Sequence, residues 1–189
     1  PALNVMCETI GLSDDIAGTH TGTDGYRAFI EGNDDNRMYS KEGGSAGDMD
    51  GDGLDDLLAS SNYLDGDRPS SVYVLTGTLS VEAAAEDIGH RIESWDDDYS
   101  EFNCALSTAG DQDGDGLADI LVGDHDGPHV GPAAYLFFGP TTHAALDLDA
   151  DVVLTNGDLD ASFGQPLDGA HDLDGDGIHD IVVGDISYD

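Results

Sequence analysis

Short runs of apolar residues alternate with polar, glycine-rich stretches along the whole chain. Three of these runs directly follow acidic loops: Leu57-Leu58-Ala59, Ile120-Leu121-Val122-Gly123 and Ile181-Val182-Val183-Gly184. Other runs lie downstream at 72–77 and 133–139, and upstream at 26–32, 90–94 and 152–157. Short runs rich in β-branched and aliphatic residues between turn residues are typical of buried strands. The pattern therefore predicts an all-β chain, in which the helix-like stretch 81–87 is a brief connection at best.

These features return with a regular period. The acidic loops begin at Asp48, Asp111 and Asp172, so successive loops start 63 and 61 residues apart. An aromatic residue lies nine positions before each loop and an alanine lies two positions before it: Tyr39, Phe102 and Phe163, then Ala46, Ala109 and Ala170. A small residue is expected where one strand presses against a neighbour. The period predicts repeated units of four short strands each.

Each acidic loop has the sequence DxDxDGxxD. Carboxylates at positions 1, 3, 5 and 9, with the main-chain carbonyl at position 7, form an oxygen-only ligand set of the kind that calcium prefers. Because four carboxylates within nine residues repel one another, a divalent ion is expected to neutralise them. The predicted ligands of three Ca²⁺ ions, one per loop, are Asp48, Asp50, Asp52, Leu54 and Asp56; Asp111, Asp113, Asp115, Leu117 and Asp119; and Asp172, Asp174, Asp176, Ile178 and Asp180. The alternative is three acidic surface turns.

Position 12 distinguishes these loops from an EF-hand, which has a bidentate Glu there and continues into a helix. The residues at position 12 are Ala59, Val122 and Val183, and each lies in one of the apolar runs. Each calcium loop is therefore expected to lead into a strand.

These residues resemble the FG-GAP repeats of integrin alpha-subunit propellers and their bacterial secreted relatives. The resemblance covers nearly the whole chain and rests on Phe163-Gly164, on Ala-Gly-Asp at 46–48 and 109–111, and on Val-Gly at 122–123 and 183–184. It implies three four-stranded β-propeller-type blades, each with a calcium loop that links two strands on its rim. The chain departs from the family where the FG pair reads Tyr39-Ser40 and Phe102-Asn103, and where GAP reads Gly-Asp. None of these departures touches a predicted ligand.

By this period we divide the chain into repeat 1 (1–77), repeat 2 (78–139) and an incomplete repeat 3 (140–189). Three blades are too few for a closed ring, which needs about four to eight. Residues 1–7 match 132–138 in register, so residues 1–10 are expected to complete the last blade of a preceding copy, at its residues 180–189. Such head-to-tail contact gives a ring or a fibre, and we expect the fibre. The alternative is an arbitrary fragment whose first strand belongs to an upstream blade.

The charge of the chain limits its partners. It contains 41 Asp and Glu against 5 Lys and Arg, for a net charge of −36. This charge argues against nucleic acids, which need basic patches, and against anionic lipid. No apolar stretch approaches the length of a membrane helix, and Pro1 opens the chain without a secretory segment, as expected of a mature or excised form. We expect an extracellular or cell-surface protein in a calcium-rich medium.

The remaining reactive side chains give weaker signals. Cys7 and Cys104 are expected to be buried free thiols, with a bonded pair as the alternative. The seven histidines are scattered, and His125 and His129 are expected to be solvated rather than to bind metal. The acidic stretches 96–98 and 147–151 are expected to be solvated faces, with auxiliary cation sites as the alternative. No GxSxG elbow supports nucleophilic catalysis, so the chain is not expected to be an enzyme.

Two functional classes fit this sequence. In the first, the chain is a calcium-stabilised structural or adhesive protein that joins copies of itself into a surface fibre and meets extracellular protein or glycan ligands. In the second, it is the non-catalytic propeller of a larger secreted enzyme or of a ligand-binding adhesin. Uniform repeats and complementary ends favour the first class, whereas a convergent acid and base pair in a pocket would favour an enzyme.

Overall fold

The computed structural model describes residues 30–31, 43–61, 70–76, 83–84, 89–93, 102–124, 131–141, 144–145, 149–157 and 162–186. These residues form the strands β1 (Ile30–Glu31), β2 (Gly43–Gly47), β3 (Asp56–Ser61), β4 (Ser71–Leu75), β5 (Ala83–Ala84), β6 (Gly89–Glu93), β7 (Phe102–Gly110), β8 (Asp119–Asp124), β9 (Ala133–Phe137), β10 (Ala144–Ala145), β11 (Val152–Leu154), β12 (Phe163–His171) and β13 (Asp180–Asp185). The all-β prediction is confirmed. No helix in the described ranges is long and apolar enough to span a membrane.

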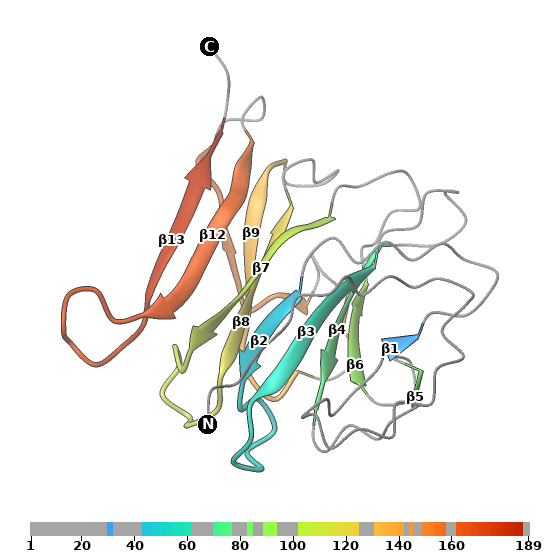
Figure 1. Cartoon of the computed structure of the whole chain (residues 1–189). Coiled ribbons are helices and arrows are strands. Elements are labelled where there is room, and N and C mark those ends of the chain that lie inside the picture. Colours follow the sequence, from blue (N-terminus) through green and yellow to red (C-terminus); the bar gives the residue numbers. More distant parts are fainter. Residues whose placement is uncertain are drawn as a thin grey trace, which may run out of the picture.

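Two sheets and a hairpin carry the three acidic loops (Figure 1). The first sheet has the strand order β10-β6-β4-β3-β2, the second has β11-β9-β8-β7, and the hairpin is β12-β13. All neighbours in them are antiparallel except β10, which is parallel to β6, while β1 and β5 form a separate parallel pair. Antiparallel sheets of this kind are consistent with β-propeller blades. Three four-stranded blades are not confirmed, because the third unit has two strands in the described residues.

Most predicted strands are present. The runs that follow the loops lie in β3, β8 and β13. The downstream runs overlap β4 and β9, and the upstream runs at 90–94 and 152–157 overlap β6 and β11. Of the stretch 26–32 only Ile30–Glu31 is described. Ala83–Ala84 is a strand, so the helix-like interpretation of 81–87 is wrong for these two residues. The strand expected at residues 3–7 lies outside the described residues.

The sheets and the sequence repeats divide the chain at different places. In the first sheet β4 pairs with β6, so this sheet takes strands from both sides of the boundary at 77/78. In the second sheet β9 pairs with β11, which bridges 139/140 in the same way. The repeat boundaries stay a prediction about the period of the sequence.

The core lies in two layers between the three units. The first layer fills the space between the two sheets with the buried residues Ala46, Met49, Leu58, Val72, Val74, Ile92, Ile120, Val122, Ala133, Tyr135 and Phe137. The second layer, between the second sheet and the hairpin, contains Ala109, Leu121 and Leu136, with Leu167 and Ile181 packed against them. Successive side chains of a strand point to opposite faces, so Ile120 and Val122 face one layer and Leu121 the other. Both faces of β8 are covered, which explains its continuous apolar run.

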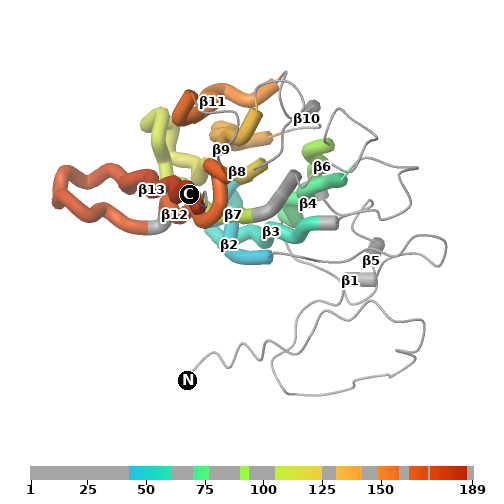
Figure 2. Tube along the Cα trace, turned by 90° about the horizontal axis from the view of Figure 1, so that it is seen from above, coloured from blue at the N-terminus to red at the C-terminus, as the bar shows by residue number. Residues whose placement is uncertain are grey.

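In the described part of the chain, the outer units do not have this double cover. Val182 of β13 is in the position that Leu121 has in β8, yet it is 52% exposed, whereas Leu121 is fully buried. At the other end, Leu57 of β3 is 41% exposed and its neighbour Leu58 is buried against the second sheet. Seen from above, β2 and β7 lie next to each other where the two sheets meet (Figure 2).

Candidate metal centre

Each acidic loop connects the two strands of an antiparallel hairpin. We call residues 48–56, 111–119 and 172–180 loops 1, 2 and 3; they join β2 to β3, β7 to β8 and β12 to β13. In Figure 1 the three loops turn at the lower ends of their hairpins. The prediction that each loop leads into a strand is confirmed, since position 9 is the first residue of β3, β8 and β13.

Two glycines give each loop its path. The glycines at positions 4 and 6 have φ between +80° and +95° in all three loops: Gly51 and Gly53, Gly114 and Gly116, Gly175 and Gly177. L-residues with a side chain rarely adopt such angles. The predicted motif noted the glycine at position 6 and left position 4 open, although all three copies have glycine there. Both glycines turn the backbone so that its N–H groups point inward.

The carboxylate at position 1 organises the turn. The two oxygens of Asp48 accept the N–H groups of Gly51 (2.8 Å) and Gly53 (3.0 Å). The equivalent bonds to Asp111 come from Gly114 (2.8 Å) and Gly116 (2.9 Å), and those to Asp172 come from Gly175 (2.6 Å) and Gly177 (2.9 Å). The Oδ1 of Asp111 also accepts the Asp115 N–H at 3.1 Å. A carboxylate oxygen has two lone pairs, so the Oδ2 atoms of Asp48, Asp111 and Asp172, which each accept one of these bonds, can still bind a cation.

The other carboxylates follow the same scheme in every loop. At position 3, Oδ1 accepts the N–H of position 5 at 3.0 Å. At position 5, Oδ1 accepts the N–H of position 7 at 2.8 Å. At position 9, Oδ2 accepts the N–H of position 2, at 2.9 Å in loop 1 and 2.6 Å in loops 2 and 3. Threefold repetition of one network means that the nine-residue sequence itself dictates this geometry.

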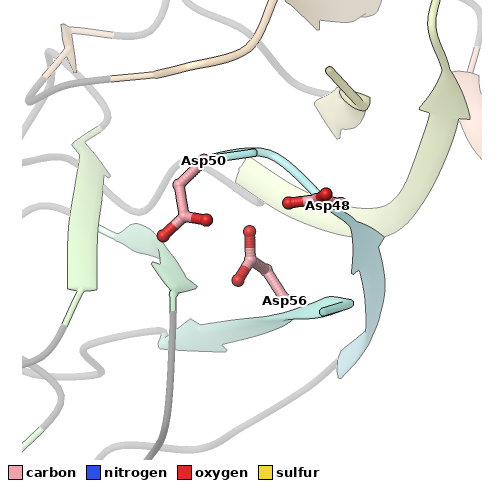
Figure 3. Close-up of side chains that lie close together, drawn as sticks. All are labelled: Asp48, Asp50 and Asp56. Atoms are coloured by element: carbon pink, nitrogen blue, oxygen red, sulfur yellow. The ribbon is translucent and has the colours of Figure 1, made fainter. Parts of the chain in front are cut away.

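Three carboxylates converge in each loop. Oxygens of Asp48, Asp50 and Asp56 lie within 4.8 Å of one another, as do those of Asp111, Asp113 and Asp115, and those of Asp172, Asp174 and Asp180. Figure 3 shows the first group, in which the three side chains point into one space. The fourth predicted carboxylates, Asp52, Asp119 and Asp176, lie outside these groups. The predicted carbonyl ligands Leu54, Leu117 and Ile178 stay predictions. Oxygen donors at this spacing suit a hard divalent cation.

Asp119 differs from the other acidic residues of its loop because it is fully buried. Its Oδ2 accepts the Gln112 N–H at 2.6 Å, and its Oδ1 accepts the Gly139 N–H at 2.9 Å. Burial raises the pKa of this carboxyl above its ordinary value of 3.8; the two backbone hydrogen bonds oppose the shift, and the nearby charges of Asp113 and Asp111 add to it. The partner Gly139 comes from the turn after β9, which no feature of the loop sequence indicates.

The structure bears on only some of the remaining sequence predictions. Asp151 accepts the Phe138 N–H at 2.8 Å, so in the acidic stretch 147–151 this side chain holds a turn. His125, His129 and Cys7 lie outside the described residues, as does the stretch 96–98. The side chain of Cys104 also lies outside them, so the state of both thiols stays a prediction.

Comparison with known proteins gives a consistent result. No protein-family model matches the chain. It is 33% identical over 153 residues to integrin alpha-PS2 of Drosophila melanogaster, and 29% identical over 196 residues to integrin alpha-5 of Xenopus laevis. These matches cover 75% and 93% of the chain; a third, to integrin alpha ina-1 of Caenorhabditis elegans, is 28% identical and covers 72%. The chain belongs to the integrin-alpha-like FG-GAP family.

The FG-GAP chain spans only part of these relatives, namely 11%, 18% and 14% of their lengths. The shared feature is therefore the repeat, and the partners of a whole integrin subunit do not transfer with it.

The glycines of the FG-GAP motif meet between the second sheet and the hairpin. Gly164 of the FG pair has φ +98°, and a Cβ on it would lie 2.4 Å from the Ala133 carbonyl oxygen. A Cβ on Gly123, near the end of β8, would lie 2.1 Å from the Gly164 carbonyl oxygen. Neither position has room for a side chain, because β12 approaches β8 and β9 closely there. At the joint between the two sheets the corresponding residues are Ser60 and Asn103, so both glycines are replaced together.

Proposed function

We propose that the chain is an extracellular, calcium-stabilised FG-GAP module with a structural or adhesive role, in which three bound Ca²⁺ ions hold three propeller-type blades. The observation that carries this proposal is the threefold repetition of one hydrogen-bonded loop in which carboxylate oxygens converge. A net charge of −36 makes the compact chain repel itself, so ions bound at the loops stabilise it.

The ligands of the proposed sites are the carboxylates at positions 1, 3, 5 and 9 and the carbonyl at position 7 of each loop. Calcium is favoured over magnesium because a flexible set of five or more protein oxygens suits its coordination of six to eight ligands at about 2.3–2.6 Å. Asp52 and Asp176, at position 5, join the ion through rotation of the side chain. Asp119, at position 9, keeps its two backbone hydrogen bonds and joins through a bridging water, as position 9 often does in calcium loops.

An extracellular setting supports this role. Calcium modules outside cells bind with dissociation constants of about 10⁻⁴ to 10⁻³ M, matched to the calcium around them. Where free calcium exceeds the dissociation constant, the sites stay filled and the ions are parts of the structure rather than signals. The integrin alpha relatives support an adhesive class.

We further propose that copies assemble head to tail, with residues 180–189 of one copy receiving residues 1–10 of the next. In the described residues β13 pairs with β12 alone, whereas β3 and β8 each pair on both sides. An edge strand with exposed apolar side chains such as Val182 favours pairing with another strand, and β13 lies at the left edge of Figure 1. Continued addition of copies gives a fibre.

The joint between copies differs from the internal joints in one respect. His171 stands before loop 3 where Gly47 and Gly110 stand before loops 1 and 2. The next loop packs so closely against these two glycines that a Cβ on either would overlap it. The proposed contact between copies therefore rests on strand pairing along β13 and not on a repeat of the loop contact.

Two measurements test the proposed function. Metal analysis of the purified chain is expected to give three calcium ions per chain, and Asp50→Asn with Asp52→Asn is expected to reduce this to two. Electron microscopy in millimolar calcium is expected to show fibres, which Val182→Lys on β13 abolishes while calcium content stays at three. A chain without calcium overturns the metal proposal, and a calcium-loaded monomer overturns the assembly.

A further inference from the structure

The three acidic loops contact one another in sequence order. Loop 2 packs on loop 1, and loop 3 packs on loop 2, each through the residue at position 8. This residue is Ala118 in loop 2 and His179 in loop 3, and it lies between the proposed carbonyl and carboxylate ligands at positions 7 and 9. These two contacts therefore lie next to proposed calcium ligands.

The contact between loops 1 and 2 is a backbone hydrogen bond. The N–H of Ala118 donates to the carbonyl oxygen of Asp48 at 2.8 Å. Gly47 makes room for this approach, because a Cβ there would lie 2.5 Å from the Cβ of Ala118. Asp48 is a proposed ligand of loop 1, and Ala118 lies between the proposed ligands Leu117 and Asp119 of loop 2. One hydrogen bond therefore connects the two sites.

The contact between loops 2 and 3 is made by a side chain. The Gln112 Nε2 donates to the carbonyl oxygen of His179 at 2.6 Å and to that of Ala109 at 2.7 Å. The backbone N–H of the same residue donates to Oδ2 of Asp119 at 2.6 Å. Gln112 thus joins a ligand of its own loop to the residue that precedes the ligand Asp180 of the next loop. The His179 ring fills the space beside Gly110, where a Cβ would overlap it.

The residue at position 2 also differs from loop to loop. Met49, at position 2 of loop 1, is buried in the first core layer, and Gln112, at position 2 of loop 2, bonds to loop 3. Leu173, at position 2 of loop 3, is 67% exposed. Loops 1 and 2 are each held by the loop that follows, while loop 3 has no following loop in the described residues.

From these contacts we infer that the three sites bind calcium cooperatively, with Gln112 as a positioning residue that couples loop 2 to loop 3. An ion that orders loop 2 fixes the Gln112 backbone through Asp119, and thereby fixes the amide that holds His179 beside Asp180. The conformational entropy that loop 3 loses on binding calcium is then smaller, so its affinity is higher. Because coupling is reciprocal, an ion in loop 3 raises the affinity of loop 2 by the same factor. This inference rests on the proposed calcium sites.

The test isolates loops 2 and 3 in the full chain. Asp50→Asn with Asp52→Asn removes two carboxylates from loop 1, and Asp113→Asn with Asp115→Asn or Asp174→Asn with Asp176→Asn does the same for loop 2 or loop 3. An Asn oxygen can still accept the backbone N–H, so each disabled loop keeps its hydrogen bonds. Calorimetric titration with calcium then gives the affinities of loop 2 alone, of loop 3 alone and of both together.

The titration of the pair gives two stepwise association constants, and the single-loop variants give one association constant each. The ratio of the product for the pair to the product for the isolated loops is expected to be about five or more, the usual lower range of coupling between sites. In Gln112→Met, which places the residue of loop 1 at this position, the ratio is expected to fall to about 1. Leu173→Met is the matched control, because it changes the same position in loop 3, and it is expected to leave the ratio unchanged.

The outcomes separate the inference from the proposed function. Three bound ions with a ratio of 1 in the parent chain would overturn the coupling and leave the calcium sites intact. A Gln112→Met ratio equal to that of the parent would overturn the role of Gln112. Absence of any calcium binding by the parent chain would overturn the proposed sites themselves. Should the single-loop variants fail to fold, the intact chain decides: Gln112→Met is expected to lower the steepness of its calcium titration, and equal steepness contradicts the inference.

Discussion

Asp119→Asn is the substitution that best separates the structural role of a loop carboxylate from its role as a ligand. Both oxygens of Asp119 accept backbone N–H groups, from Gln112 and Gly139, and the residue is fully buried. Asn has one oxygen and one NH₂ group. Whichever way its amide turns, one buried backbone N–H loses its acceptor and faces another donor.

The magnitude follows from that lost bond. An unsatisfied buried donor costs about 1–3 kcal/mol. Removal of a buried charge offsets part of this cost, because burial raises the pKa of Asp119 and so disfavours its charged form. We expect a net loss of about 1–2 kcal/mol in the free energy of unfolding, beyond any loss of calcium affinity.

Asp115→Asn is the matched control in the same loop. Asp115 is exposed, and the one backbone bond to its side chain, from Leu117 at 2.8 Å, can be kept by an amide oxygen. Its effect without calcium is expected to stay within about 0.5 kcal/mol. Both substitutions remove one proposed ligand, so the difference between them reports the structural role of Asp119.

Urea unfolding followed by circular dichroism, over a series of calcium concentrations, measures this difference. Asp119→Asn is expected to remain less stable than Asp115→Asn by about 1–2 kcal/mol wherever the chain is folded. Equal stabilities at every calcium concentration would refute the reasoning, because they would mean that the bonds from Gln112 and Gly139 contribute nothing.

Three further predictions follow from burial, backbone conformation and charge. Leu121→Ala is expected to cost about 2–5 kcal/mol in urea unfolding, whereas Val182→Ala, at the same position of the exposed hairpin, is expected to change stability by about 0.5 kcal/mol; similar losses would contradict the two-layer core. Gly164→Ala is expected to lower the melting temperature more than Gly157→Ala, because both glycines have positive φ but only Gly164 also lacks space for a Cβ; equal shifts would show that β12 does not approach Ala133 this closely. Without calcium, the raised pKa of Asp119 means that the folded chain holds more protons than the unfolded chain above pH 3.8. The contribution of Asp119 to stability is therefore present at low pH, and it is lost as pH rises through the folded-state pKa. The free energy of unfolding of the calcium-free chain, measured against pH, tests this. If Asp119→Asn leaves the slope of that dependence unchanged, the assignment is contradicted.

The loops and the strands around them were predictable from the sequence because their determinants are local. The nine residues of each loop supply their own hydrogen bonds, as Asp48 with Gly51 and Gly53 illustrates. The apolar run at 120–123 predicted a buried strand, and β8 is one. A period seen three times made each local signal stronger, and it also contained the glycine at position 4 that the predicted motif left open.

Contacts between the units were not predictable in this way. Gln112 occupies a position where the loops have Met, Gln and Leu, so its residue type carries no signal until the neighbouring loop is in place. Gly139 meets Asp119 from a different turn, 20 residues away in the chain. The pairing of β4 with β6 likewise depends on which strands the sheet brings together, and the period of the sequence does not show where one sheet ends.

The central claim, that calcium in three loops stabilises the fold, is tested most directly by the dependence of unfolding on calcium concentration. Ions that bind the folded chain alone add about 1.4 kcal/mol per site for every tenfold rise in free calcium above the dissociation constant. Three filled sites therefore predict a rise of about 4 kcal/mol per tenfold rise in calcium, measured by denaturant unfolding at fixed ionic strength. A free energy of unfolding that is the same in chelator and in millimolar calcium would contradict the account.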